Sequence, residues 1–194
     1  MLASREQPIV VAGSGIAGLT FAASMAQVGR PVVVLERGDK LLEGGGGISL
    51  WPNALAALDA IGVGDLVRQA GGPVASGGIQ RPDGSWIRRM DRNVVDDALG
   101  EPLIGVHRSD LMAILAAAAG HSVIRYGVTV RSFDDSGDRI VAHLDGGSTI
   151  EGCALVGADG IGSVVARQLN PRLTFVYSGY TAWRGVSEIG RAHV

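Results

Sequence analysis

The chain has 194 residues, of which 46% are hydrophobic and 19% charged, with 30 glycines and a formal net charge of −2. This length is typical of one domain, or of one domain with a piece of another, and the apolar content is sufficient for a buried core. The balanced charge does not favour nucleic acid or an acidic membrane surface as a partner. A single cysteine, Cys153, excludes an internal disulfide, and the sequence holds neither a membrane-length apolar run nor a signal peptide. We therefore expect a cytoplasmic protein.

The first predicted elements form a βαβ unit. Apolar runs at Pro8–Ala12 and Pro31–Glu36 are typical of strands buried on both faces of a parallel sheet, and a helix is expected over Ala17–Val28 between them. Gly18 and Ala22 share one face of this helix and carry almost no side chain. The helix is therefore expected to lie close on the sheet.

The middle of the chain is predicted to contain short helices and an inserted hairpin. Helices are expected over Asn53–Ala60 and Asp65–Ala70, with Asn53 and Asp65 as their N-caps. The expectations that follow are a hairpin of Ser76–Arg81 and Ser85–Met90 around Pro82-Asp83-Gly84, a polar loop over Asp91–Gly100, a strand over Leu103–Val106 and a helix over Ser109–Ala119.

The last part of the chain is predicted to hold an antiparallel meander next to parallel strands. The meander strands are expected at Val128–Phe133, Arg139–Leu144 and Ser148–Glu151, joined by turns rich in aspartate and glycine. The other expected elements are parallel strands at Val123–Tyr126 and Cys153–Gly157, a short helix over Ser163–Leu169 and a strand-rich aromatic stretch from Leu173 to Ile189.

A glycine-rich loop separates the first predicted strand from the first predicted helix. Gly13 permits a sharp turn, Gly15 lets the backbone approach a pyrophosphate, and Gly18 permits close helix packing. The free amides and the positive end of the helix dipole would then face the phosphates. A dinucleotide site is therefore predicted, with a plain tight turn as the alternative. The residues of the loop are Gly13, Ser14, Gly15, Ile16, Ala17 and Gly18.

An acidic residue, Glu36, ends the second predicted strand. A carboxylate at this place accepts hydrogen bonds from ribose hydroxyls and repels a 2′-phosphate, which favours FAD or an NAD-like nucleotide over NADP. The next residue, Arg37, either contacts the nucleotide or is a solvated surface arginine, and the sequence leaves both interpretations open.

Further segments distinguish FAD from NAD. They are Gly45–Leu55, His107–Leu111, Gly157–Gly160 with Ser163, and Gly179–Gly185. In this order and spacing, the chain resembles the FAD-dependent aromatic-ring monooxygenases of the p-hydroxybenzoate hydroxylase type. It is most similar to their salicylate, urate and hydroxynicotinate hydroxylase-like branch. The resemblance covers the chain from Ile9 to about Ile189.

The resemblance implies both an activity and a set of site residues. Such enzymes reduce FAD with NADH or NADPH and, through a flavin C4a-hydroperoxide, transfer oxygen from O₂ to a small aromatic or heteroaromatic substrate. Arg108 is implied to contact the FAD pyrophosphate or ribityl region, Asp159 with Gly160 to bind the ribose or pyrophosphate, and Gly46 and Gly47 to lie near the flavin. No catalytic side chain is assigned, because the cofactor carries the chemistry.

Each assignment has a simpler structural alternative. Arg108 could be an exposed arginine near a helix start, and Asp159-Gly160 could be a plain turn. Trp183 and Arg184 are candidates for contacts with an anionic aromatic substrate, although core packing and a surface position explain them equally well. The histidines lack metal-ligand spacing, so no metal site is predicted.

The chain also departs from the family pattern. Ala166 stands where relatives carry an arginine, and Arg167 follows one residue later. A further Gly-Asp segment that binds the flavin ribityl chain in the family is not found. A truncated, non-catalytic FAD- or nucleotide-binding fragment is therefore an alternative function. An NAD-dependent dehydrogenase would explain the first loop alone, and the meander with Gly157–Gly160 argues against it.

Together these features predict an α/β fold. We expect a Rossmann-like FAD-binding domain with a parallel sheet, an antiparallel β-meander, and the beginning of a β-rich substrate domain. Residues 1–73 and 94–171 are assigned to the FAD-binding domain, which is incomplete, and residues 74–93 and 172–194 to the first strands of the substrate-binding domain.

Overall fold

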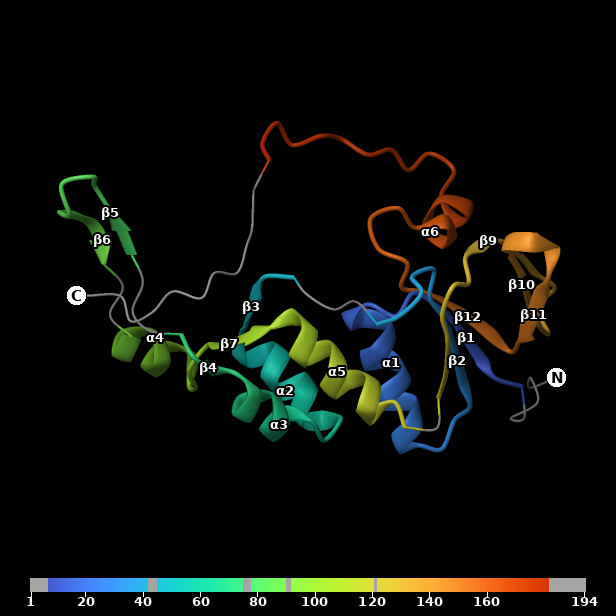
Figure 1. Cartoon of the computed structure of the whole chain (residues 1–194), viewed down its shortest axis with the longest axis horizontal. Helices are drawn as coiled ribbons and strands as arrows, with labels where there is room; N and C mark the ends of the chain where they lie inside the picture. Colours follow the sequence, from blue (N-terminus) through green and yellow to red (C-terminus); the bar gives the residue numbers. More distant parts are fainter. Residues whose placement is uncertain (1–6, 42–44, 75–77, 90–91, 121, 182–194) are drawn as a thin grey trace. The chain divides into compact units, whose positions relative to one another are not determined.

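A computed structural model describes residues 7–41, 45–74, 78–89, 92–120 and 122–181 (Figure 1). These residues group into two compact units. The first unit contains residues 7–41 and the described residues from 112 to 181, and the second contains the described residues from 45 to 111. This division differs from the domain assignment made from the sequence, which stays a prediction.

The first unit is built on a parallel sheet. Strand β1 (Ile9–Ala12) pairs with β2 (Val32–Leu35) on one side and with β12 (Ala154–Gly157) on the other, and β8 (Val123–Arg125) adds to β2. Helix α1 (Ile16–Gln27) connects β1 to β2. The predicted βαβ unit and both additional parallel strands are therefore confirmed.

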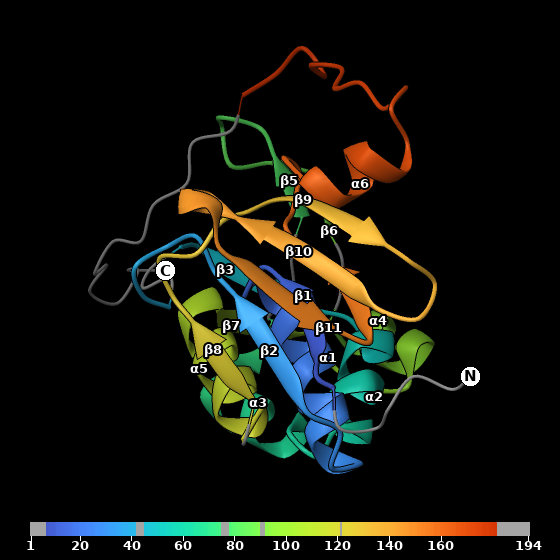
Figure 2. The same ribbon diagram turned by 90° about the vertical axis from the view of Figure 1, so that its right-hand side faces the viewer.

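Different layers cover the two faces of this sheet (Figure 2). Val11 points to the face that carries α1 and forms a core cluster with Ala22 and with Val34 of β2. Val10 and Ala12 point the opposite way, as alternation along a strand requires, and pack against an antiparallel meander. The meander consists of β9 (Val130–Asp135), β10 (Ile140–Leu144) and β11 (Thr149–Gly152), in the order β11-β10-β9. It confirms the predicted meander.

Helix α1 lies close to the sheet because Gly18 has no side chain. A Cβ on Gly18 would overlap the carbonyl oxygen of Gly13 and lie 3.3 Å from Val11 Cγ1. Gly13 has a φ of +102°, and a Cβ there would overlap the carbonyl oxygen of Ala158. Both glycines are therefore required sterically. Gly15 differs, because its φ is −69° and a Cβ there would have no described atom within 4 Å.

A short helix, α6 (Val164–Leu169), is attached to the edge of β9 by one side-chain amide. Gln168 Oε1 accepts a hydrogen bond from Phe133 N at 3.0 Å, and Gln168 Nε2 donates to Phe133 O at 2.5 Å. The amide thus satisfies backbone groups that a neighbouring strand would otherwise pair. At the start of the helix, Ser163 Oγ accepts from Ala166 N at 2.9 Å, as an N-cap does.

The second unit has an antiparallel sheet and a layer of helices. Its strands are β3 (Gly47–Leu50), β7 (Ile104–His107) and β4 (Gly72–Pro73), in the order β3-β7-β4. The helices are α2 (Pro52–Ala60), α3 (Gly64–Ala70), α4 (Arg92–Leu99) and the first turn of α5 (Arg108–Ala118). Leu50, Leu55, Val67 and Val106 are buried in this unit.

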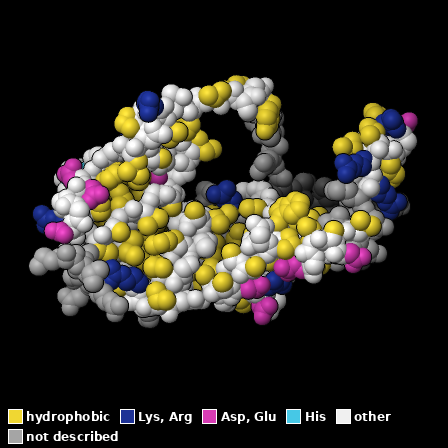
Figure 3. All heavy atoms as spheres, turned by 180° about the vertical axis from the view of Figure 1, so that it is seen from behind, with side chains coloured by type: hydrophobic (Ala, Val, Ile, Leu, Met, Phe, Trp, Pro, Cys, Tyr) yellow, Lys and Arg dark blue, Asp and Glu magenta, His cyan; other side chains and the backbone are white. Residues whose placement is uncertain are grey.

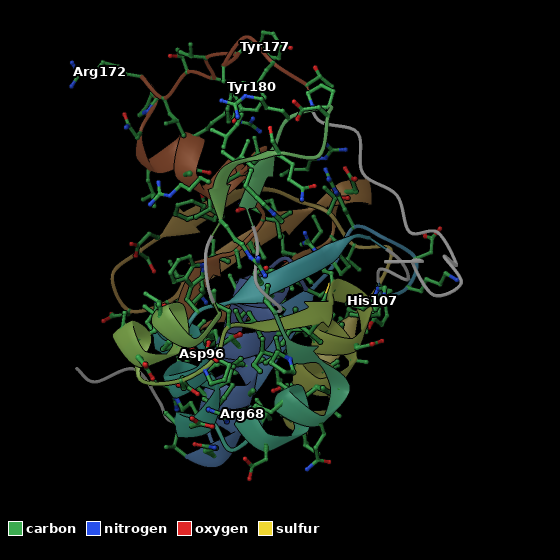
Figure 4. All side chains as sticks on the ribbon, turned by 90° about the vertical axis from the view of Figure 1, so that its left-hand side faces the viewer. Arg68, Asp96, His107, Arg172, Tyr177 and Tyr180 are labelled. Carbon is green, nitrogen blue, oxygen red and sulfur yellow. The ribbon has the colours of Figure 1, made fainter. Side chains whose placement is uncertain are left out.

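An ion-pair cluster centred on Arg68, which Figure 4 labels, links the helical layer to the segment before β7. The Arg68 guanidinium pairs with both carboxylate oxygens of Asp59, at 2.6 and 2.9 Å, and with Glu101 Oε2 at 3.1 Å. The hydrogen bond from Arg68 lowers the pKa of Asp59, and the two acidic partners raise that of Arg68. The cluster lies at the surface and joins α2 and α3 to the segment between α4 and β7.

The predicted hairpin is present in the second unit. Strands β5 (Gly78–Gln80) and β6 (Trp86–Arg89) pair antiparallel across a turn in which Gly84 has a φ of +84°. Ile79, Trp86 and Ile87 are exposed, and the Arg89 guanidinium lies 5.6 Å from the centre of the Trp86 ring. Figure 3 shows hydrophobic and basic side chains gathered on the hairpin.

Three expectations about local structure are wrong. The polar loop expected over Asp91–Gly100 contains helix α4, because no glycine or proline interrupts it before Gly100 and apolar residues recur at helical spacing. Asn53 and Asp65 are not N-caps; Trp51 and Val63 hold those positions, without a capping side chain. Residues 173–181 were expected to be strand-rich and form no strand within the described part of the chain.

The cause differs between these cases. Pro52 begins α2 because its ring presets a helical φ and it lacks the N–H that a first turn leaves unpaired, so Asn53 already lies inside the helix. A strand needs a neighbour to pair its backbone groups, and residues 173–181 have none among the described residues. The rest of the stretch expected to be strand-rich, residues 182–189, lies outside the described residues.

Replacing Gly18 tests the close approach of α1 to the sheet. We expect Gly18→Ala to lower the free energy of unfolding by about 1–3 kcal/mol, because its Cβ would displace backbone rather than a mobile side chain. The matched control is Gly15→Ala, which should cost less than about 1 kcal/mol because its Cβ meets open space. Urea unfolding followed by circular dichroism measures both; equal costs would contradict the steric explanation.

Candidate functional site

The start of helix α1 presents unpaired backbone donors. Gly13 N donates to Leu35 O at 2.8 Å and holds the turn against the end of β2. The N-cap, Gly15, supplies no capping side chain, and the first turn of the helix contains no acidic residue. The amides of Ile16 and Ala17 have no partner within the helix, as in any helix start. Together with the helix dipole, they form an environment that favours an anion.

A buried serine inside this loop holds the carboxylate of Glu36. Ser14 is only 2% exposed, and its N and Oγ both donate to Glu36 Oε2 at 2.9 Å. Gly38 N donates to Glu36 Oε1 at 2.8 Å. The backbone of Glu36 is held as well, by Arg125 O at 2.9 Å and by Val128 N at 2.8 Å. Glu36 is therefore fixed at the end of β2.

These contacts also set the charge state of Glu36. Partial burial raises its pKa, but the hydrogen bonds from Gly38 and Ser14 and the nearby charge of Arg37 outweigh it, and the net pKa lies below the usual 4.5. The Arg37 side chain is exposed, and no hydrogen bond joins its guanidinium to any described residue. The site thus carries an ionised carboxylate next to an available cation.

The third strand end at this edge is that of β12. Its continuation contacts the glycine loop, because a Cβ on Gly13 would lie 3.1 Å from Asp159 Cα. Asp159 Oδ1 accepts from Ser163 Oγ at 2.5 Å, and Oδ2 accepts from Val164 N at 2.6 Å. Gly160 has a φ of +75°. The carboxylate thus orders the turn and the first residues of α6, a role that the sequence did not suggest.

The carboxyl ends of β1, β2 and β12 therefore meet at one edge of the sheet. Gly13 and Glu36 follow β1 and β2 directly, and Asp159 lies two residues after the end of β12. This edge is where open α/β sheets bind ligands.

In the second unit, Arg108 lies beside the second glycine cluster. Arg108 N donates to Gly46 O at 3.3 Å, and a Cβ on Gly45 would lie 3.5 Å from Arg108 Cδ. Gly45 has a φ of +119°, and Gly47 pairs with His107. The Arg108 guanidinium is exposed and has no side-chain partner among the described residues. The structure thus brings together Arg108, Gly46 and Gly47, as the predicted site requires.

One face of the β3-β7-β4 sheet carries mainly glycine and serine, with His107 as its larger side chain. Alternation puts Leu50 and Val106 into the core and leaves Gly47, Ser49 and His107 on the other face (Figure 4 labels His107). A pocket of about 470 Å³ opens there, lined by Gly47, Ile48, Ser49, Ala70, Gly71, Gly72, Gly105, Val106 and His107. Sequence reasoning did not single out Ser49 and His107 as pocket residues, although the period of two in Gly47–Leu50 was available as a signal.

Other candidates are placed only in part. Trp183 and Arg184 lie outside the described residues. Ala166 lies within the capped first turn of α6, and Arg167 is exposed. No group of His, Cys, Asp or Glu among the described residues could hold a metal ion. No described helix combines the length and the apolar character needed to cross a membrane.

Comparison with known families shows to which family the chain belongs. The family described as FAD binding domain matches residues 6–183. The chain belongs to this family. The glycine loop, Glu36, Arg108 and Asp159 all fall within the matched residues of this FAD-binding domain.

Its relatives are oxidoreductases. Aurachin C monooxygenase/isomerase from Stigmatella aurantiaca is 36% identical over 181 residues, which are 93% of this chain and 47% of the relative. The 3-hydroxybenzoate 6-hydroxylase 1 of Aquipseudomonas alcaligenes is 36% identical over 189 residues, 92% of this chain and 46% of that protein. The chain thus spans about half the length of these relatives.

Solved structures show the same fold. A tetrameric form of 2-methyl-3-hydroxypyridine-5-carboxylic acid oxygenase has a TM-score of 0.74 and 28% identity, over 86% of this chain and 43% of that one. HpxO of Klebsiella pneumoniae, complexed with FAD and uric acid, has a TM-score of 0.75 at 24% identity, over 86% and 43% of the two chains. The predicted α/β fold, with its parallel sheet and meander, is therefore confirmed.

The hydrogen bonds to Glu36 predict a pH-dependent contribution to stability. Its pKa is lowered on folding, so the contribution is complete above the usual value of 4.5 and is lost as the pH falls through the lowered value. We expect Glu36→Gln to lower the unfolding free energy of the FAD-free protein by about 1–2 kcal/mol at neutral pH. The difference should shrink in acid.

Urea titrations between neutral pH and pH 3 measure this difference. Asp138→Asn, in the exposed turn between β9 and β10, controls for the loss of one surface carboxylate. A difference between wild type and Glu36→Gln that grows in acid would contradict the assignment of these contacts.

Proposed function

We propose that this chain is the FAD-binding part of an FAD-dependent monooxygenase. The enzyme would use NADH or NADPH and O₂ to hydroxylate a small aromatic or heteroaromatic substrate. The observation that carries the proposal is the edge where β1, β2 and β12 end. There an uncapped helix start, an ionised carboxylate held in place and a tight glycine turn occur together in a chain of the FAD-binding family.

The residues of the first unit fit the adenosine diphosphate half of FAD. The amides of Gly15, Ile16 and Ala17 donate to the pyrophosphate, and the space beside Gly15 admits it, because no described atom lies where a Cβ would point. Glu36 accepts a hydrogen bond from the ribose. Arg37 adds positive charge that partly offsets the two phosphates.

The turn after β12 supports this arrangement. Asp159 and Gly160 bind the ribose or pyrophosphate side of FAD in our proposal. Because both Asp159 oxygens already hold the start of α6, the residue acts mainly by fixing the turn, and accepts from the ligand with its remaining lone pairs. This division of roles explains how a carboxylate is retained close to a phosphate group.

The residues of the second unit fit the rest of the cofactor. The available guanidinium of Arg108 neutralises pyrophosphate charge, and the backbone at Gly46 and Gly47 lies near the flavin ring. Bound FAD supplies the redox chemistry, since it takes electrons from a nicotinamide and reacts with O₂. The protein's part is to bind, orient and exclude water. This accounts for the lack of an acid–base pair or nucleophile in the predicted site.

The substrate is proposed to be a small aromatic ring with an anionic or hydroxyl group. One relative is named for 3-hydroxybenzoate and a structural neighbour for a hydroxypyridine carboxylic acid, both rings of this kind. Trp183 would contact the ring and Arg184 its anionic group. Residues 74–93 and 172–194 would belong to the substrate-binding domain, and β5 and β6, with their exposed apolar side chains, would be its first strands.

Arg108 offers a direct test of FAD binding. We expect Arg108→Ala to weaken FAD binding about 10-fold or more, as loss of a charge-assisted hydrogen bond to phosphate does, and to reduce its salt dependence. Quenching of flavin fluorescence during titration measures the affinity. The control is Arg172→Ala, which removes another exposed arginine after α6 (Figure 4). Equal effects of both variants would count against a pyrophosphate contact.

Oxygen transfer is tested separately. The protein that carries this chain, loaded with FAD, should oxidise NADH or NADPH faster when an aromatic acid is present and should incorporate one atom of ¹⁸O₂ into it. Mass spectrometry of the product measures this incorporation. The panel of substrates should include hydroxybenzoates and pyridine carboxylates. If the protein binds FAD but incorporates no ¹⁸O into any of them, the monooxygenase proposal is wrong and the chain is a nucleotide-binding module.

A further inference from the structure

Ser14 is a buried residue of the loop between β1 and α1. Its side chain is 2% exposed, and its hydroxyl donates to Glu36 Oε2 at 2.9 Å. The backbone amide of the same residue donates to the same oxygen at 2.9 Å. The loop between β1 and α1 therefore contacts the residue at the end of β2 through two donors of one serine.

These donors occupy most of the acceptor capacity of Glu36. A carboxylate offers about four lone-pair positions, two on each oxygen. Ser14 fills both positions of Oε2, and Gly38 N fills one position of Oε1 at 2.8 Å. One position, on Oε1, remains for a ligand. A ribose carries two neighbouring hydroxyls, and a carboxylate with both oxygens available could accept from both.

We propose that Ser14 is a positioning residue that restricts Glu36 to a single hydrogen bond with the ribose of the bound nucleotide, through Oε1. The inference rests on the proposed function, in which Glu36 accepts from that ribose. One ribose hydroxyl is then read by the protein and the other is not. The choice between them is made by the orientation that Ser14 imposes on the carboxylate.

Of the two Ser14 donors, only the side-chain hydroxyl can be removed by substitution, because the backbone amide is present in any variant. The hydroxyl is therefore the donor to test. In Ser14→Ala the amide still donates to Oε2, but one of its lone pairs becomes available. The carboxylate can then accept from the second ribose hydroxyl. A buried serine of this size is replaced by alanine without overlap, so the variant is expected to fold.

Deoxynucleotides measure how many ribose hydroxyls are read. The probes are ADP, 2′-deoxy-ADP and 3′-deoxy-ADP, each in competition with FAD for the whole chain. For the wild type we expect one deoxy probe to bind within about 3-fold of ADP and the other at least about 10-fold more weakly, since a hydrogen bond to a charged group is lost. For Ser14→Ala, both deoxy probes should bind more weakly than ADP.

The pH profile separates positioning from general stability. With one donor fewer, the pKa of Glu36 rises in Ser14→Ala, so the affinity for ADP should decline at a higher pH than in the wild type. Ser14→Cys retains a weak thiol donor and should give an intermediate profile. A variant that merely destabilised the fold would lower the melting temperature without moving this profile.

The possible failures are distinguishable. If the chain binds no FAD, the proposed function itself fails. If it binds FAD but the wild type loses affinity equally for both deoxy probes, or for neither, the inference about Ser14 is overturned while FAD binding stands. An unchanged pH profile in Ser14→Ala would overturn it as well.

Discussion

The contact between the start of helix α1 and the turn at Gly13 is the constraint on which the ligand edge depends. Two backbones meet there without any side chain between them, since a Cβ on Gly18 would overlap Gly13 O and one on Gly13 would overlap Ala158 O. This approach places the unpaired amides of α1 next to the end of β12. Any side chain at these positions would move the helix off the sheet and the amides with it. The favourable electrostatic environment at the helix start therefore depends on the close packing that Gly13 and Gly18 permit.

Internal hydrogen bonds offset the negative charge of the carboxylates at this edge of the sheet. Two carboxylates, Glu36 and Asp159, lie just after strand ends, at the place where a pyrophosphate is proposed to bind, and an unpaired negative charge there would repel it. Donors of Ser14 and Gly38 occupy most of the acceptor positions of the Glu36 carboxylate. Donors of Ser163 and Val164 engage both oxygens of the Asp159 carboxylate. Each carboxylate thus mainly orders its own loop and keeps few acceptor positions for a ligand. The amides of α1 and the exposed cation Arg37 are left for the phosphates in our proposal.

Much of the fold could be predicted from sequence because its signals are local. Apolar runs at β1 and β2, the glycine loop and the Asp-Gly turns of the meander each specify their element within a few residues. Helix α4 differs, because its polar composition is typical of a loop although neither glycine nor proline interrupts the stretch. The Ser14–Glu36 and Gln168–Phe133 contacts could not be predicted, since they join residues that only the folded sheet brings together.

The roles of the residues in the candidate site could also be predicted only in part from the sequence. Motifs located Gly13, Glu36, Arg108 and Asp159, but residue identity alone did not separate the role of a capping carboxylate from that of a ligand carboxylate. Lone-pair occupancy does not separate them either: Glu36 accepts three hydrogen bonds from Ser14 and Gly38, Asp159 accepts three from the start of α6, and each keeps one position, on Glu36 Oε1 and on Asp159 Oδ1. What differs is the origin of the donors, which lie in two neighbouring loops for Glu36 and in one helix start for Asp159. We therefore propose that any selectivity among nucleotides at this edge depends on the donors that hold each acidic residue as well as on the residue itself.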